Sequence, residues 1–471
     1  MIFSSILFVF LFLPIVLGVH FIIAKNYRNL FILISSLFFY AWGEHLLVLL
    51  MMGSICINYV IGNIIAELQI KNKPIQTKMA LVFGVTINLL ILGYYKYVHF
   101  LIDTLSQLGF KLDVDFYNVT LPIGISFFTF QSISYLIDVY RKIVGGQKSL
   151  INLGMYIALF PQLIAGPIVR YADISKEIVN RKISSSLFKI GIKRFIGGFA
   201  KKILIANNVG LIADQVFAIS PSELSTSLSW IGIICYSLQI YYDFSGYSDM
   251  AIGLGKMLGF NFKENFEHPY ISKSIREFWR RWHISLSTWF RDYVYISLGG
   301  NRKGKYWTYA NLLIVFSLTG LWHGASWNFV IWGLFHGVFI IIERLNVIKL
   351  PSKLNVLSRG YTLLVVIIGW VFFRAENLEY GLHFIRKMFS FTSGGNNYPY
   401  IFLNNYVYAV FLIGIAFSLP LREFIERKVD SLIKDKTAIL TLKYSFYILI
   451  FIISITELAQ TTYNPFIYFR F

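Results

Sequence analysis

The chain has 471 residues, of which 56% are hydrophobic and 14% are charged, and its formal net charge at pH 7 is +19. Apolar runs long enough to cross a bilayer recur along the whole chain, so the composition predicts a polytopic membrane protein and excludes a soluble globular enzyme. Because the excess Lys and Arg lie in the loops between these runs, where positive charge sets orientation, we predict no nucleic-acid partner.

The first apolar run covers residues 1–24, and its first positive charges, Lys25 and Arg28, follow it. It has no basic region before it and no small-residue cleavage site after it, so an uncleaved first span fits better than a signal peptide. The positive-inside rule places the N-terminus outside and the Lys25 loop in the cytoplasm. The next loops alternate as this orientation requires: Glu44 outside, then Lys71, Lys73 and Lys78 inside, then Asp103, Asp113 and Asp115 outside.

An interrupted apolar segment, MYIALFPQLIAGPIVR, occupies residues 155–170 between two basic regions. Pro161, Gly166 and Pro167 break its helical pattern. One interpretation is a re-entrant segment buried in protein rather than a crossing that faces lipid. The alternative is a simple interrupted span, and the sequence favours neither.

Two further spans, at about residues 203–218 and 228–243, return the chain to the cytoplasm, where a basic and aromatic stretch begins at Arg276. The spacings of three and four predict one helix there, with a polar face at the cytoplasmic interface and an aromatic face toward lipid or core. A membrane-surface anchor without any ligand is an equally good interpretation. The polar face holds Arg276, Arg280, His283, Ser287 and Arg291, and the other face holds Phe278, Trp282, Leu286, Trp289 and Tyr293.

Two apolar segments follow, and each places a histidine inside a small-residue pattern. GLWHG contains His323 between Gly320 and Gly324, and GLFHG contains His336. The glycine spacing allows helix backbones to approach closely in a bilayer. An ionisable side chain at such a position is a functional-site candidate, which we assign to His323, whereas His336 is better explained by packing.

The rest of the chain adds a span at 361–373, a polar loop with Arg374 and Glu376, and two last spans separated by a basic patch at 422–443. We expect about a dozen crossings in one all-α membrane domain covering residues 1–471. Cys56 and Cys235 lie in apolar runs without CxxC spacing, so we predict no disulfide framework, and no metal site is indicated.

Missing motifs narrow the chemistry. The chain lacks a Walker phosphate loop, a Gly-x-Ser-x-Gly elbow and an HExxH zinc motif. It also lacks the paired broken helices in two symmetric halves that are typical of transporters. A histidine in a largely apolar pocket suits general-base work, such as taking the proton of a hydroxyl that attacks an acyl thioester. The residues therefore favour an acyltransferase.

Several motifs together resemble the membrane-bound O-acyltransferase family, and in particular its bacterial polysaccharide O-acetyltransferase branch. The resemblance covers nearly the whole chain. It is carried by LPIGISFFTFQSISYLIDVYR, FPQLIAGPIVRY, YYDFSGYSDMAIGLGKMLGF, FWRRWHISLSTWFRDYVYISLGGNR, LTGLWHGASWNFVIWGLFHG and the ending NPFIYFRF.

The resemblance implies a helical membrane fold with re-entrant segments around a central cavity near the midplane, a catalytic histidine at His323 and a supporting histidine at His283. It also implies a cytoplasmic acetyl donor, acetyl-CoA, and an extracytoplasmic polysaccharide acceptor. We expect a cell-membrane location, lipid contacts and a secreted or membrane-anchored partner acetyltransferase that completes the transfer. For the donor's phosphates the candidates are Arg280, Arg281 and Arg291, which lipid phosphates would satisfy equally well.

Other interpretations stay open at this stage. Within the family, a D-alanyl transferase of teichoic acids would use a carrier protein as its donor. From another class, a transporter of polysaccharide or lipid-linked glycan would also be polytopic and basic on its cytoplasmic side. Ser326 follows His323 closely, but we expect it to bond to the backbone rather than to act as a nucleophile. We expect Asp243 and Asp249 to pair with nearby basic residues.

Overall fold

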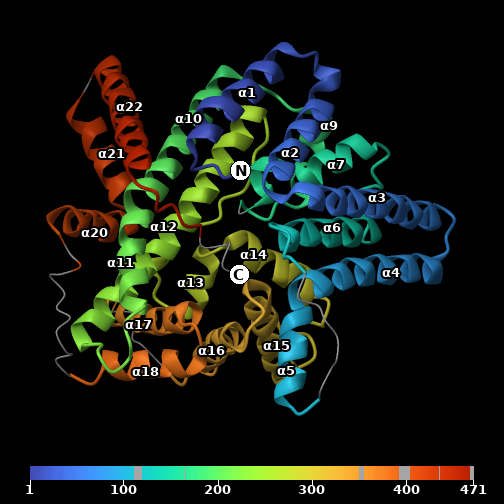
Figure 1. Cartoon of the computed structure of the whole chain (residues 1–471). Helices are drawn as coiled ribbons and strands as arrows, with labels where there is room; N and C mark the ends of the chain where they lie inside the picture. The colour runs from blue at the N-terminus through green and yellow to red at the C-terminus, as the bar shows by residue number, and fades with distance from the viewer. Residues whose placement is uncertain are drawn as a thin grey trace. The chain divides into compact units, whose positions relative to one another are not determined.

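A computed structural model describes residues 1–110, 119–164, 166–348, 355–391, 402, 404–433 and 435–466 (Figure 1). Helices are the only regular elements among these residues, as the apolar runs predict. The chain divides into two compact units. We call Met1–Phe195 with Met250–Lys263 the N-terminal unit, and Ile196–Asp249 with Glu264–Phe471 the C-terminal unit.

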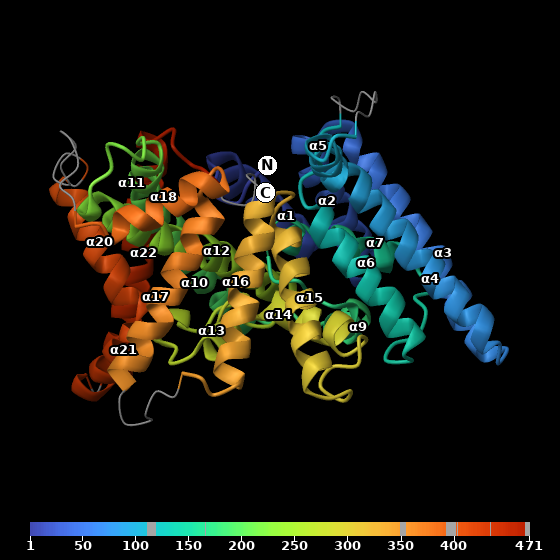
Figure 2. The ribbon, with the colours of Figure 1, turned by 90° about the horizontal axis from the view of Figure 1, so that it is seen from below.

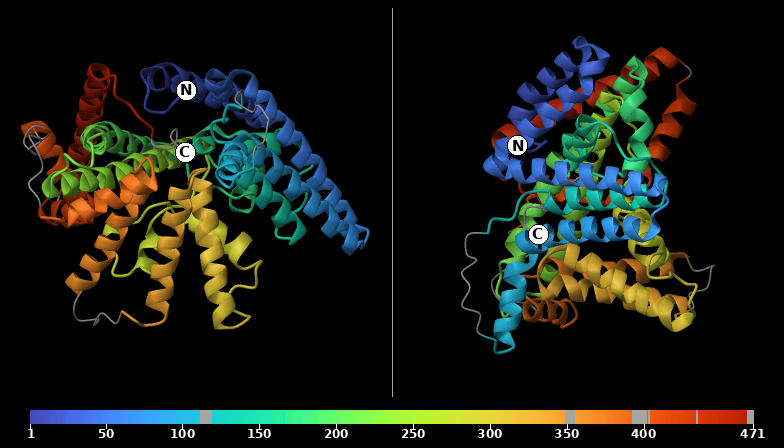
Figure 3. Two further views of the ribbon diagram at one scale, coloured as in Figure 1. Left: turned by 60° about the horizontal axis from the view of Figure 1, so that its bottom comes forward. Right: turned by 90° about the vertical axis from the view of Figure 1, so that its right-hand side faces the viewer.

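In the N-terminal unit, three long helices pack side by side. They are α3, α4 and α6, and α3 and α4 are the long blue pair in Figure 3. A Cβ on Gly62 of α3 would lie 2.6 Å from the ring of Tyr135 on α6, so glycine is needed for this approach. The helices of this unit are η1 (Phe8–Phe12), α1 (Leu13–Ile22), η2 (Lys25–Tyr27), α2 (Arg28–Glu44), η3 (His45–Leu47), α3 (Val48–Ile70), α4 (Pro74–Leu92), η4 (Gly93–Tyr97), α5 (Val98–Gln107), α6 (Ile125–Tyr140), α7 (Leu150–Ala158), α8 (Phe160–Leu163), α9 (Tyr171–Asn180) and most of α10 (Ser185–Ala200).

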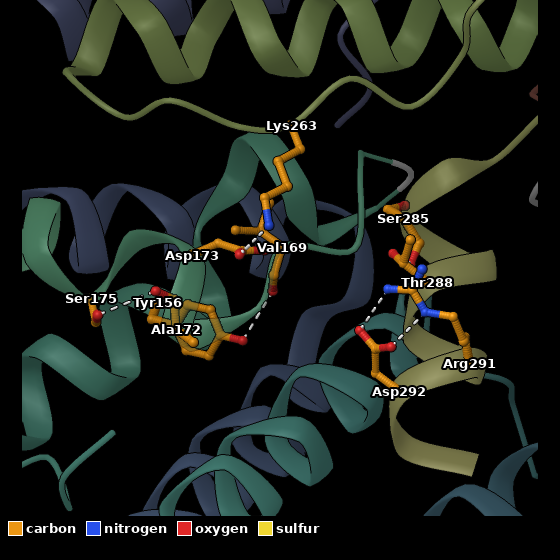
Figure 4. A network of polar contacts seen from close by, with 10 residues as sticks. All are labelled: Tyr156, Val169, Ala172, Asp173, Ser175, Lys263, Ser285, Thr288, Arg291 and Asp292. Atoms are coloured by element: carbon orange, nitrogen blue, oxygen red, sulfur yellow. Dashed lines mark hydrogen bonds and ion pairs between the residues drawn. The ribbon is translucent and has the colours of Figure 1, made fainter. Parts of the chain in front are cut away.

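The interrupted apolar segment is broken and buried, as one of its two interpretations predicts. Helix α7 ends at Ala158, Leu159 is non-helical, and the short α8 follows. Every residue from Met155 to Leu163 is buried. Part of its polar groups bond within the protein: the Tyr156 hydroxyl, for example, donates to the carbonyl oxygen of Val169 at 3.0 Å (Figure 4). Non-helical backbone at membrane depth requires this kind of internal satisfaction.

In the C-terminal unit, α15, α16 and α17 stand next to one another in chain order (Figure 2). The run predicted as a span at 228–243 is only part of α12, which continues for another fifteen residues to Leu258. The helices are η5 (Lys201–Ala206), α11 (Asn207–Phe217), the first part of α12 (Thr226–Leu258), η6 (Pro269–Ile271), α13 (Ile275–Arg281), α14 (Ile284–Trp289), η7 (Phe290–Tyr295), α15 (Lys305–His323), α16 (Trp327–Arg344), α17 (Asn355–Arg374), α18 (Leu378–Met388), α20 (Asn405–Ser418), α21 (Leu421–Leu432) and α22 (Lys436–Gln460).

The prediction of one continuous helix from Arg276 to Tyr293 is wrong. Helix α13 ends at Arg281, Trp282 is extended, and His283 has φ 45° before α14 begins. His283 is therefore buried, while Arg280 and Arg291 are exposed, so the three do not share a face. The aromatic face is buried in protein rather than lying against lipid, because Phe278 and Trp282 are only 1% and 2% exposed.

Segments that the charge pattern predicts on one side of the membrane lie together within each unit. On the predicted outer side, Glu44 accepts the N–H of Ile123 at 3.1 Å. On the predicted inner side, Gln69 donates to the carbonyl oxygen of Tyr140 at 2.7 Å. In the C-terminal unit, Arg374, which directly follows the predicted span 361–373, pairs at 2.8 Å with Asp214, near the end of the predicted span 203–218. These contacts are consistent with the alternating orientation.

Five helical runs in the described part of the chain are long and apolar enough to cross a membrane, and two shorter helices are also apolar. The expected dozen crossings remain a prediction. The long runs are Lys25–Ile70, Pro74–Gln107, Ser185–Phe217, Asn355–Arg374 and Lys436–Gln460, and the shorter ones are Phe8–Ile22 and Asn405–Ser418.

Candidate functional site

The two small-residue patterns bring α15 and α16 into direct backbone contact. A Cβ on Gly320 of α15 would lie 2.1 Å from the carbonyl oxygen of Phe329 on α16. A Cβ on Gly333 of α16 would lie 2.1 Å from the carbonyl oxygen of Phe316 on α15. Neither position has room for any side chain. The predicted close approach is thus confirmed.

His323 is the last residue of α15 and is 5% exposed. Its ring is surrounded by aromatic rings: the centroid distances are 4.9 Å to Trp322, 5.1 Å to Trp332 and 5.2 Å to Phe373. Trp332 comes from α16 and Phe373 from α17, so three helices build the apolar surroundings that the sequence predicts for this histidine.

His283 lies beside His323, with 6.3 Å between the ring centroids. The break between α13 and α14 makes this possible, because the left-handed backbone of His283 interrupts the helical path of the chain. Phe244 of α12 covers the His283 ring at 4.4 Å, and the residue is fully buried. The two histidines predicted to be catalytic and supporting are therefore neighbours.

Asn265 orients His283, and the sequence reasoning missed it. Its Nδ2 donates to the Ser248 hydroxyl at 3.0 Å, which turns Oδ1 toward His283 Nδ1 at 3.3 Å. The same Oδ1 accepts from the backbone N–H and the hydroxyl of Ser285, at 3.1 and 2.8 Å. Nδ1 must then donate to Asn265, which leaves the lone pair of the imidazole on Nε2.

Helix α13 is held at its N-terminus by two acceptors. The Ser274 hydroxyl accepts the N–H of Glu277 at 3.0 Å, a contact that the Ser-x-x-Glu spacing would have revealed. The Glu343 carboxylate, at the end of α16, accepts the N–H groups of Ile275 and Arg276 at 2.6 and 3.2 Å. This second cap ties α13 to α16, and no local pattern signals it.

The three arginines predicted to bind donor phosphates lie in different environments. Arg280 is exposed. Arg281 contacts the Glu277 carboxylate at 3.0 Å, and Arg291 makes a two-point contact with Asp292 at 2.6 and 3.1 Å (Figure 4). Two of the three guanidinium groups are thus already engaged with a carboxylate. Their role toward the donor stays a prediction.

The other polar residues singled out in the sequence are mostly structural. His336 is fully buried, and its ring lies 5.2 Å from Trp279 and 5.3 Å from Trp332, as expected of a packed residue. Asp243 pairs with Lys202 at 2.8 Å and Asp249 pairs with Lys201 at 2.7 Å, so the predicted ion pairs are confirmed. The Lys202–Asp243 pair is almost completely buried.

A pocket of about 450 Å³ begins immediately after His323. Phe373 forms part of its wall and also packs against the His323 ring, so one aromatic side chain connects the pocket to the histidine. Arg374 and Glu376 add charge to the lining. The lining residues are Phe217, Tyr236, Gly324, Ala325, Ser326, Phe329, Phe373, Arg374, Ala375, Glu376 and Tyr380.

Ser326 differs from its prediction. It stands at the N-cap of α16, yet its side chain makes no capping bond to the helix. Instead Ser326 lines the pocket, three residues after His323. The backbone of Ser326 has the extended geometry usual for an N-cap residue (φ −152°), so the missing bond is not explained by its backbone conformation.

The family model described as the membrane-bound O-acyltransferase family matches residues 141–372. The chain is also 43% identical over 492 residues to the probable alginate O-acetylase AlgI of Pseudomonas putida, with all of both chains covered. This chain belongs to the membrane-bound O-acyltransferase family. It is therefore an acyltransferase and a membrane protein, and the transporter interpretation is set aside.

Other similar proteins are also named as enzymes that transfer acyl groups. The probable alginate O-acetylase AlgI of Pseudomonas aeruginosa is 48% identical over 395 residues, which cover 83% of this chain and 75% of the relative. The peptidoglycan O-acetyltransferase of Helicobacter pylori is 34% identical, with 82% and 80% covered. The teichoic acid D-alanyltransferase of Bacillus subtilis is 32% identical over 48% of this chain and 59% of its own length. In this acyltransferase, His283 and His323 both lie within the matched family region.

Proposed function

We propose that this acyltransferase moves an acetyl group from acetyl-CoA, on the cytoplasmic side of the cell membrane, to a hydroxyl acceptor on the other side. The final product is an O-acetylated extracytoplasmic polysaccharide of the alginate, capsular or peptidoglycan type. The protein acts as a multi-pass protein of the inner or plasma membrane. The names of relatives matched over most or all of the chain, which include a probable alginate O-acetylase and a peptidoglycan O-acetyltransferase, support this substrate class.

The observation that carries the proposal is the pair His283 and His323, with His323 next to the pocket. A general base must reach the hydroxyl proton that it removes. His323 directly precedes Gly324, which lines the pocket, and its ring packs against Phe373, another lining residue. The aromatic rings around His323 exclude water, which protects a thioester from hydrolysis.

In the proposed reaction, an imidazole nitrogen of His323 takes the proton as the acceptor oxygen attacks the carbonyl carbon of the acetyl thioester. The C–O bond forms, the C–S bond breaks, and the coenzyme A thiolate receives the proton from the imidazolium. His283, fixed by Asn265, supports this site through its position beside His323. A general base of this kind contributes about a hundredfold to ten-thousandfold in rate.

The acceptor in the first transfer is a hydroxyl of a secreted or membrane-anchored partner acetyltransferase, which passes the acetyl group to the glycan. Ser326 offers a second candidate because its hydroxyl lines the pocket. A Ser326→Ala variant distinguishes the partner's hydroxyl from the Ser326 hydroxyl as the first acceptor. Retained transfer from Ser326→Ala would agree with direct attack by the partner's hydroxyl, and loss of transfer at normal protein level would favour a covalent acetyl-serine.

Arg280, Arg281 and Arg291 are proposed to bind the phosphates of the donor from the cytoplasmic side. Arg280 is the best placed of the three, because it is exposed and the other two already contact Glu277 and Asp292. Membrane-lipid phosphates are their alternative ligands.

D-alanyl transfer from a carrier protein is the second candidate within the family. The teichoic acid D-alanyltransferases of Bacillus subtilis and Streptococcus thermophilus match 48% and 47% of this chain, whereas the acetylating relatives match most or all of it. The coverage therefore favours acetyl transfer.

The test uses purified full-length protein in proteoliposomes. Acetyl-CoA labelled in the acetyl group is supplied on one side, and oligosaccharide is supplied on the other, with and without the proposed partner acetyltransferase. When the partner is present, we expect the acetyl label on both the partner and the oligosaccharide. Without the partner, we expect no labelled oligosaccharide. Full-rate acetylation of oligosaccharide without the partner would remove the relay, and transfer from a D-alanyl carrier protein but not from acetyl-CoA would replace the proposed donor.

A further inference from the structure

A second cluster of positive charge lies in the N-terminal unit, where the start of α2 meets the end of α9. Asn29 joins the two helices: its Nδ2 donates to the carbonyl oxygen of Ile178 at 2.9 Å, and its Oδ1 accepts from Arg181 Nη1 at 2.5 Å. Arg28 precedes Asn29 and is half-buried. Two guanidinium groups are thus held near each other by contacts within the protein.

One edge of the Arg181 guanidinium group makes no hydrogen bond within the described part of the chain. Its Nε and Nη2 atoms are buried, and neither has a hydrogen-bond partner among the residues that the structure describes. These two N–H groups lie on the same side of the planar guanidinium, and together they form the fork that binds a carboxylate or a phosphate at two points. A buried N–H of a charged group without an acceptor is costly, so this edge is suited to an anion.

The carboxylates closest in sequence do not fill this position. Glu177 is four residues before Arg181, the spacing of a helical ion pair, but the chain leaves α9 at Asn180 and Arg181 is extended. The Glu177 carboxylate instead accepts from the backbone and side-chain amides of Asn261, at 3.0 and 2.9 Å. Asp173 pairs with Lys263 at 2.5 Å (Figure 4).

Apolar and aromatic surroundings hold the arginine in place. The Arg181 guanidinium lies over the ring of Phe260 at 4.9 Å. Burial, together with repulsion from Arg28, lowers the pKa of Arg181 to about 10. The C-terminus of α9 supplies only about half an elementary charge of the opposite sign. The cluster therefore carries positive charge that its own surroundings do not balance.

His20 adds a third group to the cluster. It lies in the last turn of α1, is fully buried, and its ring nitrogens have no hydrogen-bond partner in the described part of the chain. Its electrostatic partners are Arg181 and Arg28. One bound anion would give an acceptor to both arginines and to a ring N–H of His20.

We propose that Arg181 and Arg28, with His20 beside them, form a binding site for a phosphate group on the cytoplasmic side of the membrane. A phosphate fits because it offers several acceptor oxygens to a two-point guanidinium contact and a second cation. The charge pattern predicts both the loop at Arg28 and the region around Arg181 to be cytoplasmic. The phosphate comes from an anionic lipid head group or from a soluble phosphate ester such as a nucleotide.

The site is independent of the proposed acetyl transfer, and its test needs no activity. The thermal unfolding of purified full-length protein in neutral detergent is followed against ligand concentration, since a ligand that binds the folded state raises the melting temperature. One arm uses inorganic phosphate. A second compares short-chain phosphatidylglycerol with short-chain diacylglycerol, and a third compares coenzyme A with pantetheine, which lacks phosphate.

The matched variants are Arg181→Gln and Lys182→Gln. Both remove one positive charge, but Lys182 is exposed. We expect a phosphate-bearing ligand to stabilise the wild type, and Arg181→Gln to weaken its apparent affinity on the order of tenfold to a hundredfold. Lys182→Gln should leave the affinity unchanged. Arg181→Lys, which keeps the charge and loses the fork, should also weaken binding.

The three ligand series of this experiment show whether the bound phosphate belongs to a lipid or to a soluble compound. If Arg181→Gln weakens it, stabilisation by phosphatidylglycerol alone assigns a lipid phosphate, and stabilisation by coenzyme A but not pantetheine assigns a soluble phosphate ester. Dependence on Arg181 is required because coenzyme A can also bind at the proposed donor site. The proposal is overturned if no phosphate-bearing compound stabilises the wild type, or if Arg181→Gln and Lys182→Gln respond alike. Should Arg181→Gln fail to fold, Arg28→Gln serves instead, because it removes the second cation and leaves the Arg181–Asn29 bond in place.

Discussion

Gly320 of α15 and Gly333 of α16 face each other where the two helices cross: a Cβ on Gly333 would lie 3.3 Å from the Cα of Gly320. This contact determines the distance between the two helices. His323 ends α15 only three residues after Gly320, so the crossing also positions the candidate base.

The first prediction concerns Gly333→Ala. Its new methyl group would meet the carbonyl oxygen of Phe316 at 2.1 Å, so the helices must separate, at a cost of about 1–3 kcal/mol. We expect a lower melting temperature and strongly reduced acetyl transfer, because His323 moves with α15. The control is Gly360→Ala on α17, where no atom lies within 4 Å of the new Cβ. Equal melting temperatures for the two variants would contradict a tight crossing.

The second prediction is that His323→Ala abolishes polymer acetylation while the protein stays folded in the membrane. Loss of a general base lowers the rate about a hundredfold to ten-thousandfold. The measurement is polymer-bound acetate from cells with matched protein levels. His336→Ala, which removes the same side chain from the sister pattern, should keep substantial activity per folded molecule.

His336→Ala leaves a cavity in the core and so lowers the stability of the protein. The acetate from this variant must therefore be divided by the amount of variant protein in the membrane. Near-normal acetate from His323→Ala would remove its catalytic assignment. Equal loss from both variants at normal abundance would have the same consequence.

The third prediction identifies Asn265 as a positioning residue. Asn265→Ala removes the acceptor for His283 Nδ1 and for two donors of Ser285, and leaving such groups unsatisfied costs about 1–3 kcal/mol each. We expect kcat to fall because His283 can change tautomer, and its pH profile to shift because the N–H of the protonated imidazole loses its acceptor. Asn265→Asp keeps an acceptor at the same place and should restore part of kcat. A fall in stability with an unchanged pH profile, and no rescue by Asp, would indicate a purely structural role.

The fourth prediction is the orientation of the loops. Single cysteines at Lys71, Arg141, Lys193, Arg280, Lys353 and Lys428 should resist a membrane-impermeant reagent added from outside, while cysteines at Asp113 and Ser222 should react. Asp113 and Lys353 lie outside the described residues. Cys56 is exposed and must first be replaced by Ser, whereas Cys235 is buried.

Lys193 is the most informative position in this experiment. It follows the broken segment 155–170, whose burial is observed but whose return to the same side is still a prediction. Strong labelling at Lys193 from outside would mean that the segment crosses the membrane. Protection at Lys193 together with protection at Arg141 would support a re-entrant path.

The amino-acid sequence by itself determined the class of this protein. The recurring apolar runs require helices that satisfy their own backbone in lipid, and the basic loops orient them. The glycine spacing around His323 and His336 was enough to predict that α15 and α16 approach closely. Six motifs spread along the chain were together enough to predict the family. Each of these patterns and motifs consists of residues close together in the chain.

Only the tertiary structure decided how the site is assembled. Periodicity alone predicted one helix from Arg276 to Tyr293, but His283 has a left-handed backbone there. That break is stabilised by contacts from afar: Asn265 binds the His283 ring and Ser285, and Glu343 caps α13. Such contacts outweigh the small helical preference of each residue, and a local pattern contains no information about them. For the same reason the packing of Phe373 between His323 and the pocket became apparent only in the folded chain.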